Sequence, residues 1–156
     1  MNSLRKMDKL CHDLSLMQAK IFEKSIEKGI PSYFFIKSFL LSDQARDLDL
    51  LNLETPGLTE AEIINDIKQN IKTRRGLLLS YPIMHFLGYF YRSASYLYQV
   101  SSRFLFENIP VKSLIRSYDY LHSLPIEEAI KDVFEIHKIQ IKTKEELFID
   151  FYRNFK

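Results

Sequence analysis

The sequence predicts an all-α fold: a single domain over residues 1–156, with six or seven helices around a central helix rich in phenylalanine and tyrosine. Three observations favour this fold. The chain has only four glycines and five prolines, fewer than the turns of a β-sandwich would need. Apolar residues recur at helical spacing, and capping signals separate the apolar runs. No repeat, low-complexity segment or linker divides the chain, and a domain of this size buries roughly 70% of its unfolded surface.

The first half of the chain contains three expected helices. Residues 3–28 form the first, because apolar side chains recur there at near-heptad spacing with lysine and glutamate between them. Gly29 suits the end of this helix, and Pro31 suits the first turn of the next, which is expected over residues 32–51. After a Thr-Pro-Gly turn, a capping box made by Thr59 and a glutamate three residues later opens a helix that reaches about residue 73.

Four further helices are expected in the second half. Pro82 opens the aromatic helix, which is expected to break near residues 99–102. Pro110 starts a helix that runs through His122, and a further helix capped by Ser123 extends to about residue 138. A second capping box, at Thr143, predicts a last helix to about residue 155.

The aromatic segment, residues 81–106, divides into two faces when it is wound as a helix. Phe86, Phe90 and Leu97 lie on an apolar face, and we expect them to be nearly fully buried. A polar stripe recurs at spacings of three and four residues on the opposite face: His85, Tyr89, Arg92, Tyr96, Gln99 and Arg103. An arginine that follows a long uncharged run must be paired if it is buried, so we expect Arg92 to be partly buried and to bind either a carboxylate, such as Asp49 or Asp119, or an adjacent tyrosine.

Two interpretations of this stripe stay open. In one, it belongs to a structural network, and His122 closes a helix–helix corner by bonding to a nearby carbonyl. In the other, one pocket binds an anionic or nucleotide-like ligand through arginine, tyrosine and histidine side chains. The candidate lining residues of that pocket are Tyr89, Arg92, Tyr96, Arg103, Tyr118 and His122.

Acidic residues are concentrated between Asp43 and Asp66, where seven carboxylates and one arginine give a local charge of −6. One interpretation is a solvated connection whose charges suit the dipoles of the neighbouring helices. The other is an acidic surface that docks a basic cleft on a partner protein, with Asp47, Asp49 and Glu54 as candidate binding residues.

Bulk properties argue against several classes of partner. A net charge of +2 does not by itself indicate nucleic acid or an acidic membrane. Cys11 is the sole cysteine, which excludes an internal disulfide and favours a cytoplasmic location, and the charged N-terminal segment is not a signal peptide. The uncharged run at residues 76–91 is shorter than the roughly 20 apolar residues of a membrane span. The four histidines show no metal-ligand spacing, so we expect no metal and no cofactor.

One pattern resembles an enzyme motif. The segment from Arg116 to His122, Arg-Ser-Tyr-Asp-Tyr-Leu-His, is similar to the Arg-x(4–6)-His motif of HEPN-type ribonucleases, which are also small and helical. The resemblance implies that His122 transfers a proton, that Arg116 stabilises the phosphate, and that the site lies at a dimer interface. The chain is then a ribonuclease toxin, and a homodimer is a possible partner arrangement.

A second resemblance covers about residues 35–136. Three short blocks carry it: Phe35-Ile36-Lys37-Ser38-Phe39 with Ser42, Ala45 and Asp49, then Tyr91-Arg92 with Ser101-Ser102-Arg103, then Tyr118-x-Tyr120-x-His122-Ser123-Leu124 with Ala129-Ile130. In this order they resemble a group of small, helical bacterial proteins whose genes lie in toxin–antitoxin-type loci. The resemblance implies an antitoxin or accessory protein that works by binding.

The sequence therefore predicts a non-enzymatic interaction protein that binds a partner protein, such as a toxin encoded nearby. The alternative is a HEPN-like ribonuclease. A nucleic-acid-binding regulator ranks third, because the expected helix from Pro110 to His122 carries only Lys112 and Arg116 against Asp119.

Overall fold

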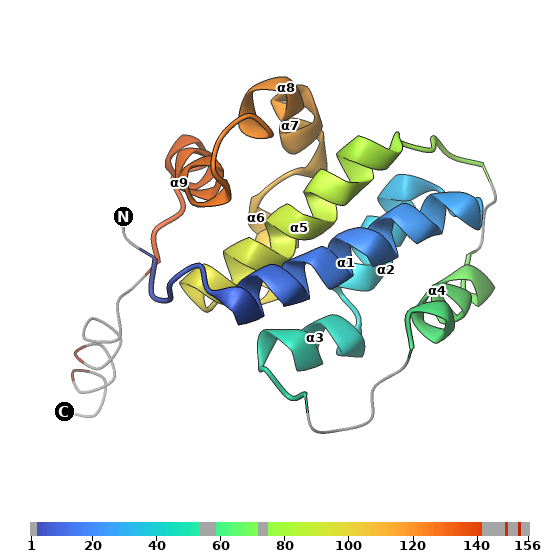
Figure 1. Ribbon diagram of the computed structural model, residues 1–156, viewed down its shortest axis with the longest axis horizontal. Coiled ribbons are helices and arrows are strands. Elements are labelled where there is room, and N and C mark those ends of the chain that lie inside the picture. Colours follow the sequence, from blue (N-terminus) through green and yellow to red (C-terminus); the bar gives the residue numbers. More distant parts are fainter. Residues whose placement is uncertain (1–2, 54–58, 72–74, 142–148, 150–152, 154–156) are drawn as a thin grey trace.

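The computed structural model describes residues 3–53, 59–71, 75–141, 149 and 153, and the regular elements within these ranges are all helices (Figure 1). The helices are α1 Lys9–Glu27, α2 Ser32–Leu40, α3 Asp43–Asp49, α4 Glu60–Gln69, α5 Tyr81–Tyr98, α6 Ser102–Asn108, α7 Val111–Arg116, α8 Tyr118–Leu121 and α9 Ile126–Ile136. The predicted all-helical architecture is thus confirmed. Nine helices are found in the described part of the chain, where six or seven were predicted.

The two long helices, α1 and α5, lie side by side through the middle of the molecule (Figure 1). Gly88 makes this close approach possible, because a Cβ atom at that position would lie 2.8 Å from the Cα atom of Ala19 and 2.8 Å from the carbonyl oxygen of Gln18. The Gln18 side chain in turn donates a hydrogen bond of 3.1 Å to the carbonyl oxygen of Gly88. Helices α2, α3 and α4 pack on one side of this pair, and α7, α8 and α9 lie on the other.

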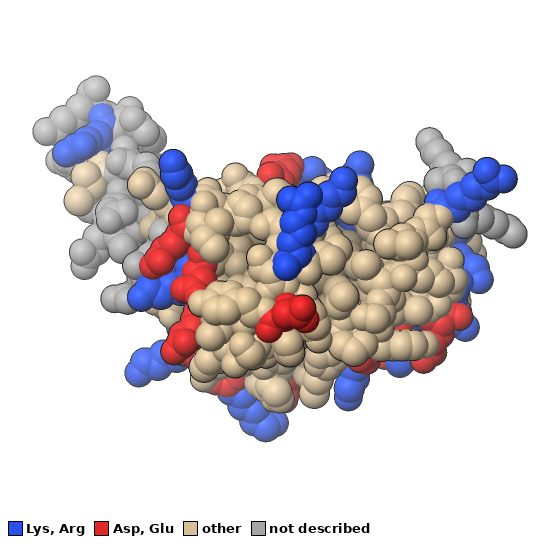
Figure 2. Space-filling model, turned by 90° about the horizontal axis from the view of Figure 1, so that it is seen from above, with Lys and Arg blue, Asp and Glu red and all other residues tan. Residues whose placement is uncertain are grey.

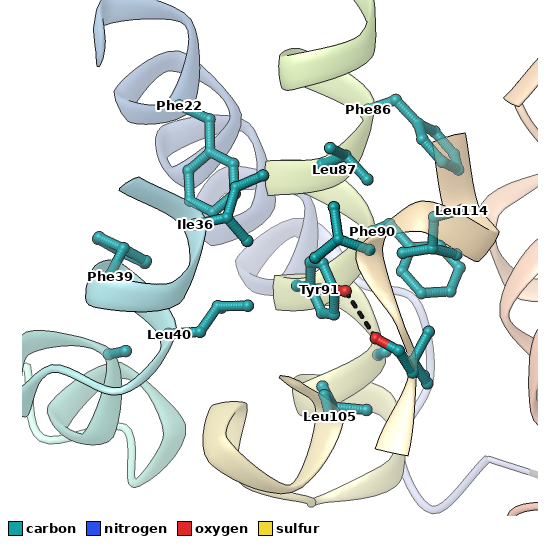
Figure 3. Close-up of a cluster of buried hydrophobic side chains, with 14 of the residues drawn as sticks. Phe22, Ile36, Phe39, Leu40, Phe86, Leu87, Phe90, Tyr91, Leu105 and Leu114 are labelled. Carbon is teal, nitrogen blue, oxygen red and sulfur yellow. Dashed lines mark hydrogen bonds between the residues drawn. The ribbon is translucent and has the colours of Figure 1, made fainter. Parts of the chain in front are cut away.

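The hydrophobic core fills the space between this helix pair and the shorter helices (Figure 3). Phe22 of α1 makes edge-to-face contacts with Phe35 and Phe39 of α2, at centroid distances of 5.5 and 5.4 Å. Tyr91 of α5 donates a hydrogen bond of 3.0 Å to the carbonyl oxygen of Ile109, which ties α5 to the segment between α6 and α7. The prediction that Phe86, Phe90 and Leu97 are nearly fully buried is confirmed: they are 9%, 0% and 1% exposed.

Two expected helices are each divided in two, and the break after α5 leaves α6 as a separate helix, which together account for the higher count. The helix predicted over residues 32–51 stops at Leu40, and Ser42 begins α3 by accepting a hydrogen bond of 3.2 Å from the backbone N–H of Ala45. The helix predicted from Pro110 to His122 is interrupted at Ser117, which lies between α7 and α8. At Ser42 the hydroxyl competes for backbone hydrogen bonds, as short polar side chains do at helix ends, whereas Ser117 makes no side-chain cap hydrogen bond.

The start of α1 also differs from the prediction. The helix begins at Lys9 and not near residue 3, because Asp8 is its N-cap and accepts a hydrogen bond of 2.9 Å from the backbone N–H of Cys11. The backbone N–H groups of Leu4 and Arg5 instead donate to the carbonyl oxygen of Leu97, at 2.8 and 2.9 Å. The segment before α1 is therefore held against the end of α5.

Other predicted boundaries are close to those observed. Thr59 is the N-cap of α4, as predicted, and its hydroxyl oxygen accepts a hydrogen bond of 3.2 Å from the backbone N–H of Glu62. The predicted break after the aromatic helix occurs at Gln99, whose φ of 51° is left-handed. Ser123 was expected to cap the helix that became α9, and this prediction is wrong. The Ser123 hydroxyl donates a hydrogen bond to the preceding carbonyl oxygen of Tyr120, and Pro125 is the N-cap residue of α9. The last predicted helix, from Thr143, falls almost entirely outside the described residues. Among the helices described, none is both long and apolar enough to cross a membrane.

Candidate functional site

The polar stripe of α5 is largely inside the protein. Every residue of this helix from Phe86 to Tyr98 is buried, with the exception of Tyr89. In the second half of α5, the polar face is therefore covered by protein as well as the apolar face. The physical reason is that α1, α3 and α6 cover the polar side and supply it with hydrogen-bonding partners.

Arg92 shows how this burial is made possible. Its side chain is 1% exposed, and each of its three nitrogens has an acceptor. Nε donates to the amide oxygen of Gln18 at 2.8 Å, Nη1 donates to Oδ1 of Asp49 at 2.7 Å, and Nη2 donates to the hydroxyl of Ser102 at 3.2 Å. Burial lowers the pKa of Arg92, and the adjacent carboxylate of Asp49 opposes that effect. The predicted ion pair with a carboxylate is confirmed, and the partner is Asp49, not Asp119.

Asp49 is also fully engaged in hydrogen bonds within the protein. Its carboxylate also accepts hydrogen bonds from the hydroxyl of Ser95 at 3.0 Å, from the hydroxyl of Ser102 at 2.6 Å and from the backbone N–H of Ser102 at 2.8 Å. With its side chain only 9% exposed, Asp49 does not belong to an acidic docking surface, which corrects that part of the sequence-based interpretation. Asp49 and Arg92 are a structural pair that joins α3 to α5 and α6.

The other acidic residues of this segment support an acidic docking surface only in part. Asp47 is exposed, as expected, and Glu54 lies outside the described residues. Glu60 forms an ion pair with Lys24 of α1, so part of the negative charge of this segment is compensated within the protein.

Tyr96 and Arg103 lie apart from the other stripe residues. Tyr96 is 8% exposed, and its hydroxyl donates to the carboxylate of Asp8 at 2.9 Å, while the guanidinium of Arg5 lies 4.9 Å from the centre of its ring. Arg103 is an exposed residue of α6, 3.6 Å from the carboxylate of Glu107. Arg92, Tyr96 and Arg103 thus do not line the same cavity as Tyr89. The interpretation that all six candidate residues share one pocket is wrong.

Three of the six candidates do come together. Tyr89, Tyr118 and His122 line an open groove of about 470 Å³ between α1, the first turns of α5, α8 and the start of α9. We call it the tyrosine–histidine groove. Its full lining is Glu23, Tyr81, Pro82, His85, Phe86, Tyr89, Tyr118, Leu121, His122, Leu124 and Ile126. The end of the molecule that carries α7, α8 and α9 faces the viewer in Figure 2, and broad areas of it carry no charged side chain.

Aromatic contacts fix the walls of the groove. The ring of Tyr118 stacks on the imidazole of His122 at a centroid distance of 4.4 Å and meets Phe86 edge-to-face at 5.5 Å. On the opposite wall, His85 stacks on Tyr89 at 6.4 Å. Because Phe86 belongs to the core, the ring of Tyr118 is held against a rigid support.

Hydrogen bonds determine which histidine nitrogen carries the proton. Nδ1 of His85 lies 3.2 Å from a carboxylate oxygen of Glu23, and Nδ1 of His122 lies 2.7 Å from the carbonyl oxygen of Tyr118. Both partners can only accept, so both Nδ1 atoms are donors. In each neutral ring Nε2 is then an acceptor. His122 thus bonds to a nearby carbonyl, as one interpretation expected, but this carbonyl belongs to α8 itself, so the bond caps α8 and does not cross to the next helix.

Tyr89 connects the groove to the first helix. Its hydroxyl is 2.7 Å from Nδ1 of His12, and the two rings are in edge-to-face contact at 5.8 Å. Burial raises the pKa of Tyr89, so its phenol stays protonated at neutral pH and can take part in hydrogen bonds as a donor.

The two residues of the HEPN-like motif occupy different elements. Arg116 is the last residue of α7, whereas His122 follows α8, and only His122 lines the groove. The motif is therefore split between two short helices, and the Nδ1 proton of His122 is already engaged by a backbone carbonyl.

Sequence reasoning left several groove residues out of the candidate site. His85 was placed on the same stripe as Tyr89 but not among the pocket residues, and Tyr81, eight residues before Tyr89, shares this face of α5, so the spacing could have added both. No sequence pattern links Glu23 or Leu124 to Tyr89, because these two residues reach the groove only through tertiary packing.

Comparisons with protein families, with characterised proteins and with solved structures give no significant match. Within the described ranges, no group of three or more histidine, cysteine or acidic side chains is placed to hold a metal ion.

Proposed function

We propose that this chain is a non-enzymatic binding protein of the antitoxin or accessory-regulator kind, and that the tyrosine–histidine groove binds its partner protein. The observation that carries the proposal is the convergence of three tyrosines, Tyr81, Tyr89 and Tyr118, with two histidines in one open groove. Tyrosine is enriched among the interface residues that dominate binding energy, because it offers a large rigid surface and a polar tip.

The chemistry of the groove favours a partner that brings hydrogen-bond donors. When the two imidazoles are neutral, the Nε2 atoms of His85 and His122 are acceptors, and the carboxylate of Glu23 adds negative charge. An arginine side chain of the partner fits these features, because its planar guanidinium stacks on tyrosine rings and donates to several acceptors at once. A partner with a basic cleft, such as a toxin that handles anionic substrates, would carry such side chains.

The two alternatives receive less support from the geometry. A HEPN-like ribonuclease needs Arg116 and His122 to act on one phosphate, and only His122 lies at the groove. A nucleic-acid-binding regulator needs a basic recognition surface, whereas the uncharged tyrosines and Glu23 of the groove would not attract phosphates.

Co-expression tests the proposal. The chain is produced together with each protein encoded beside it, and complexes are identified by size-exclusion chromatography with light scattering. We expect a complex of fixed stoichiometry with one of these proteins, and the loss of that protein's toxicity when it is a toxin. Tyr89→Ala should disrupt the complex. Tyr120→Ala is the matched control, because Tyr120 belongs to α8 but is 57% exposed and does not line the groove.

The ribonuclease alternative predicts a different pattern. The chain alone would arrest growth, and His122→Ala would relieve the arrest. That pattern, without a complex that depends on Tyr89, would contradict the proposal.

A further inference from the structure

A second groove runs between α2, α7 and the segment that precedes α5. It consists of two adjoining cavities of about 530 and 610 Å³, which share Tyr33, Val111 and Lys112. We call it the lysine-rimmed groove, because Lys37 and Lys112 stand beside its apolar lining. None of its lining residues belongs to the tyrosine–histidine groove, so the inference does not rest on the function proposed above.

Large apolar side chains are exposed along this groove. Leu77 is 78% exposed and Tyr33 is 56% exposed, although the segment that carries Leu77 is firmly attached to the protein. The backbone N–H of Ser32 donates to the carbonyl oxygen of Leu77 at 3.0 Å, and the Ser32 hydroxyl accepts a hydrogen bond of 2.9 Å from the backbone N–H of Leu79. A partner that covers Leu77 therefore gains apolar burial without first ordering the backbone that presents it.

Gly76 explains how this segment comes to lie so close to α2. A Cβ atom at position 76 would lie 2.5 Å from the Cβ atom of Pro31, so only glycine fits against the proline ring. Next to this contact Leu77 is exposed, while Leu79 is partly buried against the core. The exposed leucine is thus a built feature of this surface.

The charges around the groove are mainly positive. Lys37, Arg75 and Lys112 line its two cavities, and Glu107 is the one acidic side chain among the lining residues described. The carboxylate of Glu107 lies 3.6 Å from the guanidinium of Arg103, which offsets its charge. An apolar floor with a cationic rim is complementary to a segment that is apolar on one face and acidic on the other.

We infer that the lysine-rimmed groove binds an acidic amphipathic helix of a partner protein. The leucines and aromatic residues of that helix would fill the cavities beside Tyr33 and Leu77, and its carboxylates would face Lys37 and Lys112, in the helix-in-groove mode. A symmetric contact with a second copy of this chain would bring lysine against lysine, which is unfavourable. A flat membrane surface could touch Leu77 but would leave the cavities unfilled.

Binding of a synthetic peptide tests the inference. The probe is a labelled amphipathic peptide with leucines at helical spacing on one face and glutamates on the other, and its affinity is measured by fluorescence anisotropy against the full chain. A second peptide, with lysine in place of every glutamate, tests the role of charge. We expect the acidic peptide to bind and the basic one not to bind. Added salt should weaken the binding, because the charge pairs would lie at the rim.

Substitutions then locate the binding site. Lys37→Glu and Lys112→Glu should each weaken binding of the acidic peptide about tenfold, and Leu77→Ser should weaken it by a similar factor. Lys131→Glu is the matched control, because Lys131 is an exposed residue of α9 that lines neither cavity, and it should leave the affinity unchanged.

Three outcomes would overturn the inference. One is an equal affinity for the acidic and basic peptides. Another is the absence of peptide binding together with binding to phosphatidylserine vesicles that Leu77→Ser abolishes, which would assign the surface to a membrane. The third is self-association in sedimentation experiments that Lys112→Glu changes, which would assign it to a second copy of the chain.

Discussion

Arg92 and Asp49 form a buried ion pair, with Nη1 of the arginine 2.7 Å from Oδ1 of the aspartate and side chains that are 1% and 9% exposed. The two residues come from α5 and α3. Ser102 at the start of α6 bonds to both of them. The pair therefore fixes the positions of two short helices relative to the long helix α5. Because the guanidinium of Arg92 is fully bonded within the protein, it is not free to bind a ligand, as one interpretation of the sequence expected.

Arg92→Lys is expected to destabilise the protein. Lysine keeps the charge but cannot reproduce the planar fork that reaches Gln18, Asp49 and Ser102 together, so buried acceptors lose their donors. We expect the free energy of unfolding in urea to fall by about 3 kcal/mol. Arg103→Lys, at an exposed arginine, should change it by less than about 0.5 kcal/mol. Equal effects at the two positions would show that the Arg92 network does not stabilise the fold.

Gly88→Ala tests the packing of α1 against α5. Alanine at an ordinary helical position stabilises a helix by roughly 1 kcal/mol relative to glycine. At position 88 the added Cβ atom would meet the backbone of Ala19 and Gln18 at 2.8 Å, and backbone atoms cannot move aside as a flexible side chain can. The two helices must then separate, so we expect a net loss of about 1–3 kcal/mol in chemical denaturation. A variant as stable as the wild type, or more stable, would mean that α1 and α5 leave room for a Cβ atom at position 88.

The N-cap of α1 should make stability depend on pH in the acid range. The hydrogen bond from the backbone N–H of Cys11, and next the one from the hydroxyl of Tyr96, lower the pKa of Asp8 below its ordinary value of 3.8. A carboxyl group with a lowered folded-state pKa stabilises the fold above its unfolded pKa, and this contribution is lost as the pH falls through the folded value. The melting temperature of Asp8→Ala should therefore lie below that of the wild type at neutral pH, and the difference should shrink below pH 3.8. Asp13→Ala, at an exposed carboxylate of the same helix, serves as the control. A difference that stays constant down to the lowest pH would contradict the role assigned to Asp8.

Much of the fold could be predicted from the sequence because helix boundaries carry local signals. Thr59 and Pro82 marked helix starts within a residue or two, and the periodicity of Phe86, Phe90 and Leu97 identified core positions. The divisions at Ser42 and Ser117 were missed, because serine within an apolar run is compatible with either a continuous helix or an interruption.

The candidate site was less predictable because it depends on which faces the other helices cover. Tyr89 and Arg92 are three residues apart on α5, yet one lines an open groove and the other lies in the core. Arg92 is buried because Gln18, Asp49 and Ser102, far apart in the sequence, supply its acceptors. Periodicity places residues on a common side of a helix, but tertiary packing decides whether that side meets solvent or protein.

The affinity of the partner complex for groove variants is the most direct test of the proposed binding surface. The dissociation constant is measured by calorimetry for the wild type, Tyr89→Ala and Tyr120→Ala, after thermal melts have shown that each variant is folded. If the tyrosine–histidine groove is the binding surface, Tyr89→Ala should weaken binding by about thirtyfold, the effect of losing a hot-spot residue, and Tyr120→Ala should leave it within about twofold of the wild type. A folded Tyr89→Ala variant that binds the partner as tightly as the wild type would contradict the assignment of the groove as the binding surface.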